Sequence, residues 1–135
     1  KVKYYDYFEL SLVKTSRNLE YPIHNDVGKK LLSVVIFISK EKNEGTLLYK
    51  KGSKKVFKQI EWKSNRSFAF SRLEGVTSHS YRANNENDRF TLIINLTTSK
   101  PLRAIFSEKQ LISKLVATKL LIRKCKNYLL SQLKK

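Results

Sequence analysis

Residues 46–73 have the sequence TLLYKKGSKKVFKQIEWKSNRSFAFSRL, and this stretch decides the fold class. It contains three runs rich in aromatic and aliphatic residues, at 46–50, 56–62 and 67–73, separated by short segments of Gly, Ser, Asn and Lys. Short runs of this kind, with apolar and polar side chains alternating, are typical of β-strands, and the segments between them are typical of turns. The stretch therefore predicts three consecutive antiparallel strands.

The same pattern continues on both sides of this stretch. Five further strands are predicted, at residues 4–13, 17–23, 31–38, 77–81 and 89–98. The run LLSVVIFI at 31–38 is almost continuously apolar, which predicts a strand buried on both faces. Eight short strands spaced by roughly 8–12 residues favour a β-sandwich or barrel. We expect residues 1–100 to form a mainly β jelly-roll core, of the double-stranded β-helix or cupin-like type.

After Pro101 the pattern changes to a helical one. Residues 107–135 carry apolar side chains at roughly helical spacing, with many basic residues between them. This predicts an amphipathic C-terminal helix with Ser107 as its N-cap and Gln110 in the capping-box position. We expect residues 101–135 to form a basic helix that packs on the core. Contact of this helix with a membrane surface is the less favoured alternative.

The composition limits the setting in which this chain works. Of its 135 residues 41% are apolar, which is enough for one domain with a core. The single cysteine excludes an internal disulfide, and no run approaches the roughly 18 apolar residues of a membrane span. No apolar leader is visible, so we expect a cytoplasmic protein. Because the chain does not begin with Met, we also expect a segment upstream of Lys1.

The net charge of +17 predicts attraction of anions, although a lysine-rich composition alone can produce such a charge. Lys29 and Lys30 follow the segment HND and would lie at the mouth of a cavity, where they attract an anionic substrate or are simply solvated. A bare edge strand near the N-terminus could pair with another chain, which leaves an oligomer open.

The two histidines of the chain, together with one aspartate, suggest a metal site. His24 and Asp26 are two residues apart, so on an extended segment their side chains point to the same side. His79 lies on a predicted strand near the end of the β region. Two histidines and one carboxylate form the facial triad of non-haem Fe(II) oxygenases, which leaves coordination positions open for substrates. The alternative is a solvated turn with a local hydrogen bond between His24 and Asp26.

A second candidate group begins at Arg89, ten positions after His79, and includes Thr91 on the same face of the predicted strand. A guanidinium that faces a cavity is costly unless it meets an anion, and its fork matches a carboxylate. The alternative is an exposed arginine at a strand end beside Asp88. The opposite face of the strand is expected to be core, and its residues are Phe90, Leu92, Ile94 and Leu96.

Together these residues resemble the 2-oxoglutarate/Fe(II)-dependent oxygenase superfamily, especially its prolyl 4-hydroxylase-like branch. The family pattern is His-x-Asp, a β-rich stretch, a distal His and then an Arg or Lys. It is matched here by HND (24–26), SHS (78–80) and RFT (89–91). The segments KKLLSVVIFIS, NEGTLLY and NRSFAFSRLEGVTSHSY also look like family segments, so the resemblance covers about residues 4–98.

The resemblance implies an Fe(II) cofactor held by His24, Asp26 and His79. It implies a 2-oxoglutarate cosubstrate bound by Arg89, with Thr91 assisting. The implied reaction consumes O2 and couples oxidative decarboxylation of 2-oxoglutarate to succinate and CO2 with hydroxylation of a C–H bond in an unidentified substrate. Four further residues could reach the cosubstrate or the ligands: Tyr21, Ser33, Tyr81 and Asn95.

The chain departs from the family pattern at both ends. Most members carry helices before the first core strand, and a basic C-terminal helix is not a general family feature. RFTLIINLTT lacks the second Arg of the Arg-x-Asn-x-Thr-x-Arg pattern found in the branch that demethylates nucleic acids, so we do not expect a nucleic-acid substrate. The alternative to an enzyme is a non-catalytic basic jelly-roll module that binds an anionic polymer through its positive charge.

Overall fold

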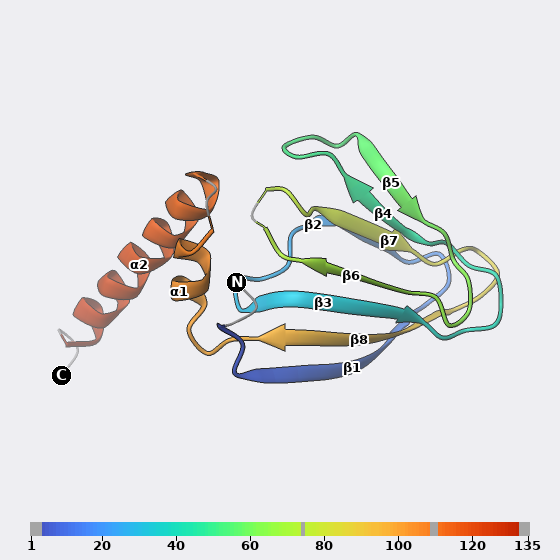
Figure 1. Cartoon of the computed structure of the whole chain (residues 1–135), viewed down its shortest axis with the longest axis horizontal. Helices are drawn as coiled ribbons and strands as arrows, with labels where there is room; N and C mark the ends of the chain where they lie inside the picture. The colour runs from blue at the N-terminus through green and yellow to red at the C-terminus, as the bar shows by residue number, and fades with distance from the viewer. Residues whose placement is uncertain (1–3, 74, 109–110, 133–135) are drawn as a thin grey trace.

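The computed structural model describes residues 4–73, 75–108 and 111–132 of the chain. It is mainly β, with two four-stranded antiparallel sheets followed by two helices (Figure 1). The strands are β1 (Tyr7–Thr15), β2 (Glu20–His24), β3 (Lys30–Phe37), β4 (Thr46–Tyr49), β5 (Val56–Ile60), β6 (Ser67–Ser71), β7 (His79–Arg82) and β8 (Arg89–Thr97). The helices are α1 (Pro101–Phe106) and α2 (Leu111–Gln132). All eight predicted strands are therefore confirmed.

Each sheet interleaves strands from both ends of the β region. One sheet has the order β1-β8-β3-β6 and the other has the order β2-β7-β4-β5. Most neighbouring strands are thus distant in the sequence, and all pairs are antiparallel. The two sheets face each other, with the first below and the second above in Figure 1. This arrangement brings side chains from the start and the end of the β region into one interior.

The inner face of the first sheet is more polar than the sequence predicted. Burial alternates along β3, so only one face of residues 31–38 is buried, and the prediction of burial on both faces is wrong. On β8 the buried face carries Arg89, Thr91 and Asn95. The predicted core face of β8 is only half-buried on the outside of the sheet, and its residues are Phe90, Leu92, Ile94 and Leu96. The expectation that these four residues form the core is therefore wrong, whereas the expected cavity-facing position of Arg89 agrees with the structure.

The outer face of the same sheet is apolar. Phe8, Leu10 and Leu12 on β1 are exposed, and in register they lie beside the half-buried apolar residues of β8. The neighbouring β3 adds the half-buried Leu32 and Val34. Among the described residues, none shields the three β1 side chains from water.

The C-terminal region forms two helices instead of the one that we predicted. Pro101 opens α1 at a position where its missing N–H costs nothing. Ser107 is the C-cap of α1, and its hydroxyl donates to the carbonyl of Ala104, so the prediction of Ser107 as an N-cap is wrong. The predicted partner in that cap, Gln110, lies outside the described residues. The apolar periodicity identified from the sequence begins at Leu111, so it indicated α2 and not the short α1 before it.

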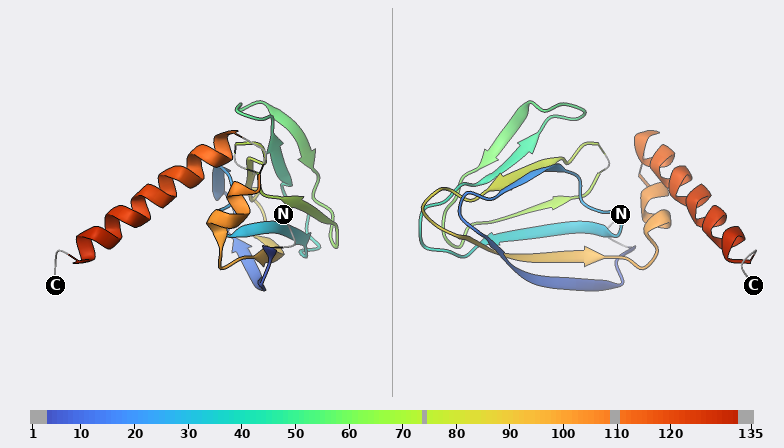
Figure 2. Two further views of the ribbon diagram at one scale, coloured as in Figure 1. Left: turned by 60° about the vertical axis from the view of Figure 1, so that its left-hand side comes forward. Right: turned by 180° about the vertical axis from the view of Figure 1, so that it is seen from behind.

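The first helix, α1, packs against the loop between β2 and β3. Ala104 and Ile105 are buried, and a methyl group added to Gly28 would come within 2.7 Å of the Ile105 side chain. The longer α2 contacts α1 and extends away from the sheets, with Leu115 and Ile122 exposed (Figures 1 and 2). Neither helix, over the residues described, is long and apolar enough to cross a bilayer.

A buried ion pair ties the helical region to the first sheet. Arg72, which follows β6, lies 3.5 Å from Glu108, which follows α1, and both side chains are 1% exposed. Removing one partner of a buried ion pair typically costs about 3–5 kcal/mol, because the other charge loses its compensation. We expect Glu108→Ala to lower the free energy of unfolding by about this amount in urea denaturation.

The exposed pair of Arg66 and Glu61 provides a matched control for this measurement. Exposed pairs contribute roughly 0–1 kcal/mol, so Glu61→Ala is expected to leave the urea midpoint nearly unchanged. Equal effects of Glu108→Ala and Glu61→Ala would contradict a structural role of the buried pair.

Candidate functional site

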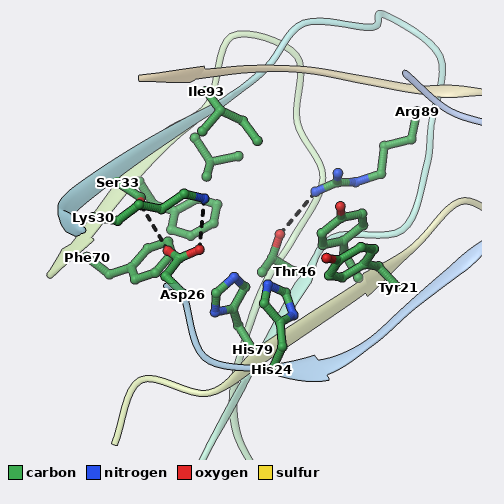
Figure 3. A pocket seen from close by; sticks show the side chains of 13 residues that line it. Tyr21, His24, Asp26, Lys30, Ser33, Thr46, Phe70, His79, Arg89 and Ile93 are labelled. Carbon is green, nitrogen blue, oxygen red and sulfur yellow. Dashed lines mark hydrogen bonds and ion pairs between the residues drawn. The ribbon is translucent and has the colours of Figure 1, made fainter. Parts of the chain in front are cut away.

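A cavity of about 140 Å³ lies between the two sheets (Figure 3). The first sheet contributes Lys30, Ser33, Val35, Phe68, Phe70, Arg89 and Ile93 to its lining. The second sheet contributes Tyr21, His24, Thr46, His79 and Tyr81, and the loop after β2 contributes Asp26. The three predicted metal ligands and the predicted cosubstrate arginine therefore line one cavity.

The pairing of β2 with β7 brings the two histidines together. His24, the last residue of β2, is directly opposite His79, the first residue of β7, and their ring centroids are 4.2 Å apart. The register of this pair shifts between Tyr21 and His24, around Pro22. Proline is tolerated here because β2 is the edge strand of its sheet.

Both imidazoles contact a backbone carbonyl through the same ring nitrogen, Nδ1. Nδ1 of His24 lies 3.0 Å from the carbonyl oxygen of Pro22, and Nδ1 of His79 lies 3.2 Å from that of Thr77. A carbonyl oxygen only accepts, so each Nδ1 carries the proton and donates it. The neutral ring then has its lone pair on Nε2, which is the arrangement that hydrogen bonds impose on metal-binding histidines.

The carboxylate of Asp26 completes the cluster. Lys30 Nζ donates to its Oδ1 at 2.9 Å, and Ser33 Oγ donates to its Oδ2 at 3.0 Å (Figure 3). One ligand atom from each of His24, Asp26 and His79 can be chosen so that all three lie within 4.8 Å of one another. Two imidazole nitrogens and one carboxylate oxygen at these separations are able to hold a divalent transition-metal ion.

The surroundings keep two of these residues in the protonation state of a ligand. Burial alone would raise the pKa of Asp26, but the hydrogen bond and charge of Lys30, with smaller contributions from His79 and Ser33, lower it below its ordinary value. Burial lowers the pKa of His79, and this outweighs the opposing hydrogen bond to the carbonyl of Thr77. An ionised carboxylate and a neutral imidazole are the forms that bind metals.

The lowered pKa of His79 has a consequence for stability. Between the folded pKa and the ordinary value of about 6.5, the unfolded chain binds more protons than the folded one, so stability rises with pH. We expect the free energy of unfolding of the metal-free protein to fall as the pH is lowered from about 6.5 through the lower, folded pKa. The measurement is urea denaturation at closely spaced pH values. The His79→Asn protein should lack this pH-dependent loss of stability. If the free energy of unfolding depended on pH in the same way in both proteins, His79 would not be its cause.

Arg89 is a buried cation at the other end of the cavity. Its side chain is 2% exposed, and one Nη donates to the hydroxyl of Thr46 at 3.1 Å (Figure 3). Within the described part of the chain, its Nε has no hydrogen-bond partner and no carboxylate forms an ion pair with the guanidinium. The guanidinium stacks on Tyr81, with Cζ 4.4 Å from the ring centroid. Burial lowers the pKa of Arg89 to about 10.

The alternative of an exposed arginine beside Asp88 is therefore wrong. Asp88 instead pairs with Lys14 at 2.8 Å and accepts from the backbone N–H of Arg17. A buried guanidinium without a counter-charge is energetically unfavourable, and such a group indicates a place for an anionic ligand.

The other predicted site residues have different positions. Tyr21 and Tyr81 line the cavity as a stacked pair, with ring centroids 5.1 Å apart, and Ser33 lines it beside Asp26. Thr91 is fully buried on the inner face of β8 but does not line the cavity, and no described residue forms a hydrogen bond with its hydroxyl. Asn95 is also outside the lining and contacts it indirectly, because its Oδ1 lies 2.8 Å from Ser33 Oγ.

Several lining residues were not identified from the sequence. Thr46, which binds Arg89, opens the strand that follows the Gly45 turn, and its position in NEGTLLY was the available signal. Phe68 and Phe70 lie two residues apart on the same face of β6, which the alternation of SFAFS indicated. Lys30 was predicted only as loop charge or an anion attractor, and no feature of the sequence indicated its contact with Asp26.

Comparison with known proteins provides no family. No family model and no curated protein matches this sequence. A similar solved structure comes from work described as "Bacillus endospore appendages form a novel family of disulfide-linked pili". It is 12% identical, covers 69% of this chain and 88% of that chain, and gives a TM-score of 0.39. A likeness at this level supports no conclusion about fold or function.

Proposed function

We propose that the chain is an Fe(II)- and 2-oxoglutarate-dependent dioxygenase of the prolyl 4-hydroxylase-like kind, which hydroxylates a C–H bond of a substrate not yet identified. The observation that carries this proposal is the presence of two complementary binding ends in one cavity. One end has the candidate ligand cluster of His24, Asp26 and His79, and the other has the buried Arg89, for which the described residues provide no counter-charge.

The residues of the cluster fit an iron ion. Both histidines contact backbone carbonyls through Nδ1, which leaves Nε2 as the nitrogen available to a metal, and the lowered pKa of Asp26 favours its ionised form. Three protein ligands leave positions open for a cosubstrate and for O2. When bound, the metal would supply the site for O2 activation, and the protein residues hold it and limit access of water.

The residues at the other end fit a dicarboxylate. A carboxylate placed against Arg89 would compensate its charge and accept from the unpaired Nε. Thr46 already holds the guanidinium in place through its hydroxyl, and the unpaired hydroxyl of Thr91 lies two residues along the same inner face. The opposite carboxylate and the keto oxygen of 2-oxoglutarate would then be directed toward the metal ligands.

The strand order supports the finer fold that we propose, a double-stranded β-helix. Orders β1-β8-β3-β6 and β2-β7-β4-β5 interleave strands from the two halves of the region, as expected when a long antiparallel hairpin folds over itself. We further propose a reducing, cytoplasmic setting, with which the single cysteine agrees.

The proposed reaction is balanced without any further reactant. 2-Oxoglutarate loses CO2 and is oxidised to succinate by one oxygen atom of O2, and the other oxygen atom enters the C–H bond of the substrate. The protein's part is to fix the dicarboxylate at Arg89 and to keep one side of the cluster accessible. Phe68 and Phe70 provide an apolar wall beside it.

The test is an anaerobic titration with Fe(II), followed by 2-oxoglutarate. We expect the weak visible charge-transfer absorption of a 2-oxo acid chelated to Fe(II), and formation of succinate and CO2 after O2 is admitted. The matched control is His79→Ala, which should give neither signal. Wild-type protein that is folded but gives no absorption and no succinate would overturn the proposal.

The non-catalytic alternative has one supporting observation. The hairpin of β4 and β5 exposes a cluster of basic side chains, which are Lys50, Lys51, Lys54, Lys55 and Lys58. This surface could attract an anionic polymer. It does not account for a buried arginine and a histidine–aspartate cluster in the interior, so the enzyme is the favoured function.

A further inference from the structure

The carboxylate of Asp26 is the one candidate ligand that already has a cationic partner. Lys30 Nζ lies 2.9 Å from Oδ1, and Ser33 occupies Oδ2. The two histidines differ, because in the described residues their Nδ1 atoms are hydrogen-bonded and no hydrogen bond reaches Nε2. His24 and His79 therefore each have a ring nitrogen available to a metal ion. The third candidate ligand, Asp26, already forms an ion pair with the ammonium group of Lys30.

Lys30 is placed so that it can leave. It is the first residue of β3, its side chain is 25% exposed, and it lines the same cavity as the three ligands. A lysine has four methylene groups and a compact charge that water solvates strongly, so it exchanges partners easily. If a divalent ion binds Asp26, the ammonium group would face a second positive charge at close range, and the two repel each other.

We propose that Lys30 is an internal counter-ion of Asp26 that is exchanged for the metal ion, so that metal loading releases its ammonium group from the carboxylate. This inference rests on the proposed metal centre. The exchange has two consequences. Lys30 lowers the affinity of the cluster for metal, because the metal must displace it. The released ammonium group adds positive charge to the cavity that holds Arg89, so metal binding raises the affinity for a dianion.

The neighbouring Lys29 is the natural control. It pairs with Glu9 at 2.6 Å, and its side chain is 45% exposed. Substituting either lysine by methionine removes one positive charge from the same segment of the chain, but only Lys30 contacts a candidate ligand. A difference between the two variants therefore reports contact with Asp26 and not net charge.

The experiment is calorimetric titration of Mn(II), a redox-stable stand-in for Fe(II), into wild-type, Lys30→Met, Lys29→Met and His79→Ala proteins. We expect Lys30→Met to bind Mn(II) about tenfold more tightly than wild type, as is typical of competition at one site. Lys29→Met should change the affinity by less than about twofold, since an exposed charge is screened. Lys30→Gln is the second variant if Lys30→Met does not fold.

The outcomes separate this inference from the proposed function. If wild type binds Mn(II) through His79 and Lys30→Met binds no more tightly, or Lys29→Met tightens binding equally, the exchange is overturned and the metal centre stands. If neither wild type nor Lys30→Met shows binding that depends on His79, both are overturned. Binding by Lys30→Met and not by wild type would support the exchange in its strongest form.

A second titration tests the released charge. Succinate is titrated into wild type and Lys30→Met, each with and without saturating Mn(II). We expect Mn(II) to raise the succinate affinity of wild type by about fivefold or more and that of Lys30→Met by clearly less. If Mn(II) raised the succinate affinity of both proteins equally, the released ammonium group of Lys30 would not contribute to anion binding, and the exchange would be overturned.

Discussion

Arg89→Met is expected to raise the stability of the protein and to weaken its binding of dicarboxylates strongly. The guanidinium is 2% exposed and has no described carboxylate partner, and burial lowers its pKa to about 10. A depression of this size corresponds to roughly 3 kcal/mol of unfavourable burial for the charged form. Methionine fills a similar volume without that cost but loses the hydrogen bond to Thr46, so we expect a net gain of about 1–3 kcal/mol.

The loss of binding is the larger of the two effects. Removing one partner of a buried, hydrogen-bonded charge pair costs about 2–5 kcal/mol, so the affinity for 2-oxoglutarate should fall by roughly 30-fold or more. The fluorescence of Trp62 can report this, because it is the single tryptophan of the chain and its ring lies 5.3 Å from the Arg89 guanidinium. Stability is measured in the same samples by urea denaturation.

Two controls accompany this prediction. Arg89→Lys retains the positive charge but lacks the planar guanidinium that binds a carboxylate through two hydrogen bonds. We expect this variant to bind dicarboxylates weakly and to gain less stability than Arg89→Met. Arg66→Met removes an exposed arginine that pairs with Glu61 and should change neither quantity by much. An Arg89→Met protein that is less stable and binds 2-oxoglutarate normally would show that Arg89 has only a structural role.

The second large effect is expected at the metal ligands. His79→Ala should lower the affinity for Mn(II) by more than the roughly 100-fold that loss of a partner outside the ligand set can cost. Its Nε2 is one of three candidate donors, and the backbone carbonyl of Thr77 fixes its orientation. The measurement is calorimetric titration, with near-ultraviolet circular dichroism to show that the variant is folded.

Ser78→Ala is the matched control for this variant. Ser78 precedes His79 and donates to Asn25 at 3.3 Å, so the change affects the same segment without removing a ligand. We expect its affinity for Mn(II) to remain close to that of wild type. A His79→Ala protein that still binds Mn(II) as tightly as wild type would show that the three residues do not form the site.

The strands were predictable because turn residues and alternation are local signals. The runs within residues 46–73 became β4, β5 and β6, and the break at Pro101 began a helix. The buried face of β8 was not predictable by the same rule. That rule assumes an apolar interior, whereas the interior here carries Arg89 and Asn95.

Part of the candidate site was predictable because the spacing of its residues along the chain is also a local signal. Residue spacing in HND and the later position of His79 suggested one cluster, and the pairing of β2 with β7 brings these residues together. The contact of Lys30 with Asp26 depends on the conformation of the loop between β2 and β3. The alternation of apolar and polar residues does not predict that conformation. The pair of Arg72 with Glu108 was not predictable either, because it is a contact between residues distant in sequence.

Under the proposed function, the polar interior would link the lifetime of this protein to the supply of metal and dicarboxylate. A ligand that binds only the folded chain stabilises it by about 2.7 kcal/mol at a concentration 100 times its Kd. Because Arg89 is buried without a described counter-charge, the empty protein lacks the stabilisation that a bound anion would provide. In a cell, a shift of this size changes the unfolded fraction that proteases remove, and with it the abundance of a protein. Scarcity of metal or dicarboxylate would therefore reduce the amount of this protein as well as the occupancy of its site.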